Sequence, residues 1–68
     1  MREYLRELRE KSHINQEELA ERLGISRSYY VRIERAERQE NLNISIAAKL
    51  AEIFGVTVDW IAQQEKER

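Results

Sequence analysis

Apolar side chains recur along the chain at the three- and four-residue spacing of helices, in segments that short polar turns separate. Between residues 15 and 24, Leu19 and Leu23 lie four residues apart with Ala20 beside Leu19, and most of the other side chains are charged. This is the pattern of an amphipathic helix with one buried face. Similar spacing predicts helices over 2–11, 15–24, 26–35, 43–54 and from 57 onward. The sequence therefore predicts an all-α fold.

Capping signals mark where these helices begin and end. Asn15 can cap the helix that follows it while the side chain of Glu18 reaches back to the backbone amide of Asn15, and Ser26 stands at the same place before the next helical segment. Between them, Gly24 can adopt the left-handed conformation that ends a helix, because it has no Cβ. Further signals of these kinds stand at Asn43, Gly55 and Thr57. Residues 15–33 are thus expected to form two short helices joined by a tight turn.

The second of these two helices has an outward face that is rich in arginine. Tyr30 and Ile33 point toward the core, and at about 100° per residue five other side chains share the opposite arc. They are Arg27, Ser28, Val31, Arg32 and Arg35. This face is available to an anionic partner.

The overall charge of −1 over 68 residues does not by itself indicate a nucleic-acid ligand, because domains that bind phosphate are usually basic. The distribution of charge changes this picture. The segment 25–38 holds four basic and two acidic side chains, whereas 39–68 holds three and five. An acidic remainder can reduce nonspecific DNA binding while leaving one basic face. The charge pattern is consistent with DNA binding without proving it.

The composition excludes several kinds of chemistry. The chain has no cysteine, and His13 is its one histidine, so a disulfide framework, a thiolate metal site and a histidine dyad are all excluded. There is no glycine-rich phosphate loop and no apolar segment of about 18 residues. The sequence predicts a soluble, cytoplasmic domain that is not an enzyme and has no cofactor, no metal site and no membrane segment.

The stretch NQEELAERLGISRSYYVRIE resembles the helix-turn-helix of the Cro and phage-repressor (XRE-type) class of DNA-binding regulators. The upstream LRELREK and the downstream AAKLAEIFGVTVDWI are similar to the first helix and the last two helices of that class. The resemblance implies a single domain over 1–68, folded as a compact five-helix bundle, with a polar tail at 63–68 that is expected to fray. It also implies that 27–34 form the recognition helix, which lies in the major groove of double-stranded DNA.

Position in this motif implies two groups of DNA contacts. The residues expected to contact base edges are Arg27, Ser28, Val31 and Arg32. The residues expected to contact phosphates are Gln16, Tyr29, Arg35, Arg38 and Asn43. Arginine suits a bidentate contact with guanine, and the helix N-terminus at Gln16 favours a phosphate. Alternatives stay open: Ser28 suits bases or phosphate, Tyr29 suits DNA or the protein surface, and each arginine can be a solvated surface charge.

The resemblance further implies an ion pair between Arg9 and Glu34, which ties the first helix to the end of the recognition helix. The alternative is two solvated charges. Because the class often has glycine near His13, this residue is expected in the left-handed conformation.

The segment after the recognition helix departs from the class. Members commonly end this helix with Asn-Gly, whereas this chain has Arg35-Ala36, and the loop over 35–43 is longer than usual. Without the glycine, the helix is expected to run on by part of a turn.

The last helix is expected to form a homodimer interface. A chain this short buries only about 60% of its unfolded surface, and the class commonly acts as a two-fold dimer. Apolar side chains stand on two sides of the segment after Thr57, and two such sides need two surfaces to cover them. The residues assigned to the interface are Val58, Trp60 and Ile61. For Trp60 the alternative is burial in the domain's own core.

Two classes of function fit these features. The leading hypothesis is a sequence-specific transcriptional regulator, a repressor that binds a pseudo-palindromic operator as a homodimer and is regulated by self-association or by a separate protein partner. The alternative is a protein-interaction module, such as an antitoxin, in which DNA binding is secondary. An enzyme has almost no support, because no residue constellation for catalysis is present.

Overall fold

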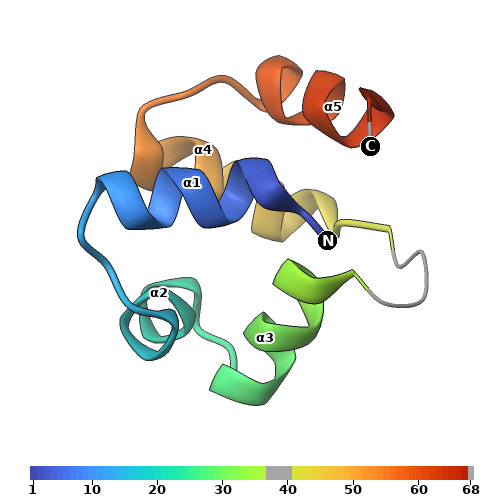
Figure 1. Cartoon of the computed structure of the whole chain (residues 1–68). Coiled ribbons are helices and arrows are strands. Elements are labelled where there is room, and N and C mark those ends of the chain that lie inside the picture. Colours follow the sequence, from blue (N-terminus) through green and yellow to red (C-terminus); the bar gives the residue numbers. More distant parts are fainter. Residues whose placement is uncertain (37–40, 68) are drawn as a thin grey trace.

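Five α-helices make up the secondary structure of residues 1–36 and 41–67, which are the parts of the chain that this computed structural model describes (Figure 1). They are α1 (Glu3–Lys11), α2 (Gln16–Leu23), α3 (Arg27–Arg35), α4 (Ile44–Phe54) and α5 (Val58–Glu67). These residues contain no strand, and none of these helices has the length and apolarity needed to cross a bilayer. The predicted all-α fold of five helices is confirmed.

Polar side chains cap the helix starts that the sequence predicted. Asn15 Oδ1 accepts a hydrogen bond at 2.8 Å, and Ser26 Oγ accepts one at 3.1 Å, each from the backbone amide three residues further on. Thr57 Oγ1 makes the same contact at 2.9 Å before α5, and Asn43 Oδ1 accepts from the amide two residues on at 2.7 Å. Each cap satisfies an amide that has no partner within its helix.

Among the described residues, ones with positive φ follow four of the helices. Gly24 and Gly55 have φ of 73° and 68° and follow α2 and α4 directly. His13, in the turn after α1, has φ of 57°, as the resemblance implied. The turn at Gly24 lets α3 cross α2 closely, which is the geometry of a helix-turn-helix.

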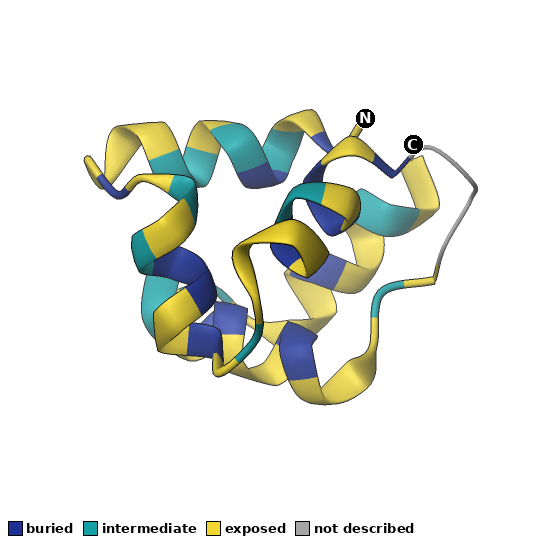
Figure 2. Ribbon diagram, turned by 90° about the horizontal axis from the view of Figure 1, so that it is seen from below, coloured by how far each residue is buried: buried dark blue, intermediate teal, exposed yellow. Residues whose placement is uncertain are grey.

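One apolar cluster fills the space between the helices. Its largest fully buried apolar side chains come from all five of them: Leu5, Leu19, Leu23, Tyr30, Leu50 and Ile61. Figure 2 shows buried positions alternating with exposed ones along each helix, as amphipathic helices around a shared core require. In Figure 1, α1 passes between α5 on one side and the α2–α3 pair on the other. In this view the α2–α3 pair therefore lies on the other side of α1 from α5, although Arg2 contacts both Ile33 of α3 and Glu65 of α5.

Helix α3 ends at Arg35 and does not run on, so the expectation of a longer helix is wrong. Ala36 takes the left-handed conformation, with φ of 47°, and its amide donates to Arg32 O at 2.9 Å. For a residue with a Cβ, this conformation is unfavourable by about 1–2 kcal/mol. Burial of the Ala36 methyl group, which is 8% exposed, offsets part of that energy. Most of the loop that the sequence predicted to differ, including Arg38, lies outside the described residues.

A partly buried ion pair joins α5 to the start of α1, where the sequence predicted a frayed tail. Arg2 is 1% exposed, and its Nε and Nη2 lie 2.8 and 2.9 Å from the two carboxylate oxygens of Glu65. Arg2 Nη1 donates to Ile33 O at 2.6 Å, and the Tyr4 hydroxyl donates to Glu65 Oε2 at 2.5 Å. Helix α5 continues to Glu67, so the segment expected to fray is helical over 63–67.

The three residues assigned to a dimer interface lie in different surroundings. Ile61 is 2% exposed and belongs to the domain's own core, so little of its surface is available to a partner. Trp60 is 37% exposed, and its ring meets Tyr4 edge to face at 5.9 Å between centroids. Val58 is 41% exposed. Of the two apolar sides of α5, one therefore packs into the core and the other packs against α1.

The contribution of the Arg2–Glu65 pair to stability can be tested by substitution. We expect Glu65→Gln to lower the free energy of unfolding by about 1.5–3 kcal/mol, because a charged hydrogen bond to a buried guanidinium is lost. Urea denaturation followed by circular dichroism measures this change. Glu18→Gln is the matched control, because it breaks the exposed Arg22–Glu18 pair, which we expect to contribute about 0.3–0.5 kcal/mol. Equal effects of the two substitutions would contradict the assigned role of Glu65.

Candidate nucleic-acid interface

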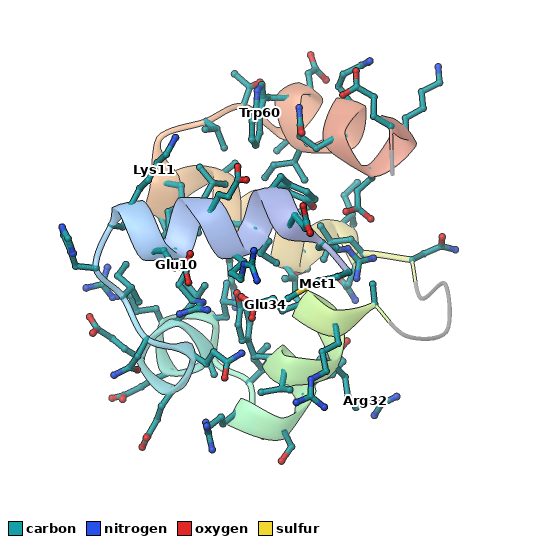
Figure 3. The ribbon with its side chains drawn as sticks, in the orientation of Figure 1. Met1, Glu10, Lys11, Arg32, Glu34 and Trp60 are labelled. Atoms are coloured by element: carbon teal, nitrogen blue, oxygen red, sulfur yellow. The ribbon has the colours of Figure 1, made fainter. Side chains whose placement is uncertain are left out.

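The carboxylate of Glu34, near the end of α3, lies in the interior and holds three helices together. Glu34 is 2% exposed. Arg9 Nε of α1 donates to Oε1 at 2.9 Å, Gln16 Nε2 of α2 donates to Oε2 at 2.8 Å, and the Tyr30 hydroxyl donates to Oε1 at 2.9 Å. Figure 3 shows Glu34 in the space between α1 and α3. The ion pair that the resemblance implied between Arg9 and Glu34 is thus part of a larger network.

The donors around Glu34 keep it ionised. Burial by itself raises the pKa of this carboxyl, but hydrogen bonds from Arg9, Gln16 and Tyr30, with the charge of Arg9, hold the pKa below its ordinary value. Burial and the adjacent Glu34 raise the pKa of the Tyr30 hydroxyl. Burial opposes the charged form of Arg9, but its bond to Glu34 outweighs this and raises the pKa of the guanidinium. At neutral pH the network therefore contains one anion, one cation and two neutral donors.

The outward face of α3 carries the side chains expected to meet base edges. Arg27, Ser28 and Arg32 are exposed, and Val31 is half-buried. In Figure 3 the side chain of Arg32 extends from α3 away from the other helices. A shallow hollow of about 370 Å³ is lined by these four residues together with Gln16 and Arg35. The structure thus gathers six of the nine expected DNA contacts on one surface.

Gln16 has a second role that the sequence did not indicate. One hydrogen of its amide is directed to Glu34, while Gln16 also lines the hollow over α3. A primary amide carries two N–H donors, so one donor stays available to a phosphate. Gln16 therefore connects the internal network to the surface on which DNA is expected.

Two of the other expected phosphate ligands, Tyr29 and Asn43, are not part of this hollow. Tyr29 is 36% exposed on α3. Asn43 is exposed at the start of α4, where its Oδ1 already caps the helix. Arg38 lies outside the described residues. No group of three or more metal-ligating side chains occurs in the described residues.

One residue that lines this region was not predicted from the sequence. Arg6 of α1 lines a cleft of about 560 Å³ between α1, the start of α2 and α3, together with Arg9, Gln16 and Arg27. The available signal was its spacing, because Arg6 stands three residues before Arg9 and so on the same face of α1. The spacing did not indicate that Arg6 faces α2 and α3.

Comparison with known families decides the class of the protein. A model of the helix-turn-helix family matches residues 5–61, which include all of α2, α3 and α4. The chain belongs to the Cro/C1-type (XRE) helix-turn-helix family. A search of curated proteins and a search of solved structures gave no match.

Membership of this family fixes the general role. The protein is a DNA-binding helix-turn-helix domain of a regulatory family whose members are generally not enzymes.

The depressed pKa of Glu34 predicts an acid-sensitive contribution to stability. The carboxyl binds a proton more readily in the unfolded chain, so this contribution is complete above its ordinary pKa of 4.5 and is lost as pH falls through the lower value in the folded state. At neutral pH we expect Glu34→Gln to lower the free energy of unfolding by about 3 kcal/mol, because Arg9 loses its charged partner. The difference from the parent protein should shrink below pH 4.5.

Denaturation curves collected at several pH values measure this effect. Glu17→Gln is the control, because Glu17 is an exposed carboxylate on the same turn of α2 as Gln16. A difference between Glu34→Gln and the parent that stays constant with pH would refute the assigned ionisation of Glu34.

Proposed function

We propose that this protein is a sequence-specific transcriptional regulator that represses by binding a pseudo-palindromic operator as a homodimer, with α3 in the major groove. The observation that best supports this proposal is the basic outward face of α3, on which Arg27, Ser28 and Arg32 are exposed. The Glu34 network fixes the opposite face of the same helix to α1 and α2. A helix held in this way can place its side chains against base edges without first losing conformational freedom.

The proposed readout divides between two kinds of contact. Arg27 and Arg32 suit guanine O6 and N7, with discrimination of about 1–3 kcal/mol per base pair, and Val31 suits the methyl group of thymine. Gln16 at the start of α2, with Tyr29, Arg35, Arg38 and Asn43, contacts phosphates and fixes the register of the helix. Ser28 donates to a base edge or to a phosphate. Repression follows from occupation of the operator, which needs no further surface on the protein.

A homodimer gives this small recognition surface enough specificity. One domain covers a few base pairs, whereas two domains related by a two-fold axis read half-sites about 34–36 Å apart. The surface that we assign to the interface is the exposed apolar part of α5 and the start of α4. Val58 is 41% exposed there and Ile44 is 79% exposed. Both line an apolar hollow of about 330 Å³ that also includes Leu42, Ala47 and Ala62, and the exposed edge of Trp60 lies on the same helix.

DNA binding should respond steeply to salt and to the loss of two arginines. If about six phosphates are contacted, raising the salt from about 50 to 200 mM should weaken operator binding by about 10³-fold. Arg27→Ala and Arg32→Ala should each reduce the preference for one base pair by about 1–3 kcal/mol. The operator is obtained by selecting bound DNA from a random pool, and fluorescence anisotropy measures the affinities.

Arg22→Ala is the matched control for these variants, because Arg22 is exposed on α2 and pairs with Glu18. Unchanged base preference after removal of both Arg27 and Arg32 would refute the readout. A flat salt response of the parent protein would instead favour the interaction module.

The dimer proposal has its own test. Val58→Glu should convert the dimer to a monomer and weaken operator binding, because a buried unpaired carboxylate opposes association. Sedimentation velocity measures the oligomeric state. Gln63→Glu is the control, because it adds the same charge at an exposed site of α5 that does not line the hollow. A dimer that persists in Val58→Glu would show that this surface is not the interface.

A further inference from the structure

The side chain of Arg6 forms no ion pair within the part of the chain that the structure describes. It is half-buried on α1, and its Nε is shielded from solvent with no hydrogen-bond partner among the described residues. Neither acid near it on α1, Glu3 or Glu10, forms an ion pair with it in the described residues. Because Nε is shielded, an external anion would be bound through the two Nη atoms, which have no hydrogen-bond acceptor among the described residues either.

The other arginines show that this is unusual within the molecule. Arg2 pairs with Glu65, Arg9 with Glu34 and Arg22 with Glu18. Arg27, like Arg6, has no ion pair or side-chain hydrogen bond among the described residues. Both of these unpaired arginines line the same cleft of about 560 Å³ between α1, α2 and α3.

The charges around this cleft favour an anion. Arg6, Arg9, Arg27 and Arg35 line it, against the carboxylates of Glu17 and Glu34. Glu34 is already bonded to Arg9 and two neutral donors. The start of α2 also lines the cleft at Asn15 and Gln16, so the positive end of the helix dipole adds to the field there. The balance is therefore positive.

The position of the cleft identifies the anion as a DNA phosphate. Gln16, Arg27 and Arg35 line both the cleft and the hollow over α3. The two surfaces are therefore continuous. When the major groove of a duplex lies over α3, one of the sugar-phosphate strands that border the groove passes across Gln16 toward α1. An arginine side chain there can bind a phosphodiester through two parallel N–H donors.

We propose that Arg6 is a further phosphate ligand and that the cleft between α1, α2 and α3 binds the DNA backbone beside the surface read by α3. This inference rests on the proposed function, since it requires α3 to occupy the major groove. It extends the contact to α1, which carries none of the DNA contacts assigned to the recognition motif. Arg6 contributes to affinity alike for every base sequence, because a phosphate carries no sequence information.

The test compares Arg6→Gln with Arg22→Gln, which removes the same charge from an exposed site on α2. Operator DNA and a scrambled duplex are titrated over a range of potassium chloride concentrations. For Arg6→Gln, the slope of log K against log salt should become shallower by about 0.9 per domain, with the same fold-loss on both duplexes. Arg22→Gln should keep the parent slope. Arg6→Lys, which retains the charge, should keep the slope and lose part of the affinity.

The outcomes separate this inference from the proposed function. If the parent protein binds operator with a steep salt slope and Arg6→Gln keeps both slope and affinity, the phosphate role of Arg6 is refuted while the regulator remains. If the parent protein shows no salt-dependent DNA binding, the proposed function itself is refuted. Thermal melting of each variant by circular dichroism checks that it is folded. Should Arg6→Gln unfold, a parent-like affinity of the folded Arg6→Lys variant would refute the bidentate contact.

Discussion

Removing the Glu34 carboxylate from water is unfavourable, and the fold compensates with donors from three different helices. Arg9 supplies a charge, while Gln16 and Tyr30 supply neutral hydrogen bonds. Because these donors come from α1, α2 and α3 itself, satisfying one acceptor sets the relative positions of all three helices. The recognition helix is therefore fixed at its C-terminal end by the carboxylate and at its N-terminal end by the Ser26 cap and the turn at Gly24. Its outward side chains project from a rigid support.

Features determined by neighbouring residues could be predicted from the sequence. The caps at Asn15 and Ser26 and the turn at Gly24 depend on contacts within three or four positions, so their residue types are sufficient to identify them. The Arg9–Glu34 pair spans 25 positions and followed only from resemblance to a family. Features that neither neighbouring residues nor the family resemblance indicated were not predicted. They include the bond from Gln16 to Glu34, the left-handed cap at Ala36, the burial of Ile61 and the pair between Arg2 and Glu65.

The division of charges reconciles an acidic composition with a DNA-binding family. Several of the carboxylates neutralise arginines within the fold, as Glu34 does for Arg9 and Glu65 for Arg2. The outward face of α3 carries three arginines and no carboxylate among the residues that line its hollow. Net charge sums over both groups and hides this separation. The outward face of α3 is positive although the chain as a whole carries −1.

The pair between Arg2 and Glu65 also bears on the kinetics of folding. Its two residues are 63 positions apart, whereas most other contacts in this helical fold are local. Closing so long a segment is entropically demanding, so we expect the α2–α3 unit to assemble earlier and this pair to form on the native side of the transition state. Interactions of that kind slow unfolding without accelerating folding. The contact between the first turn of α1 and the last turns of α5 would then determine how long the native domain persists once formed.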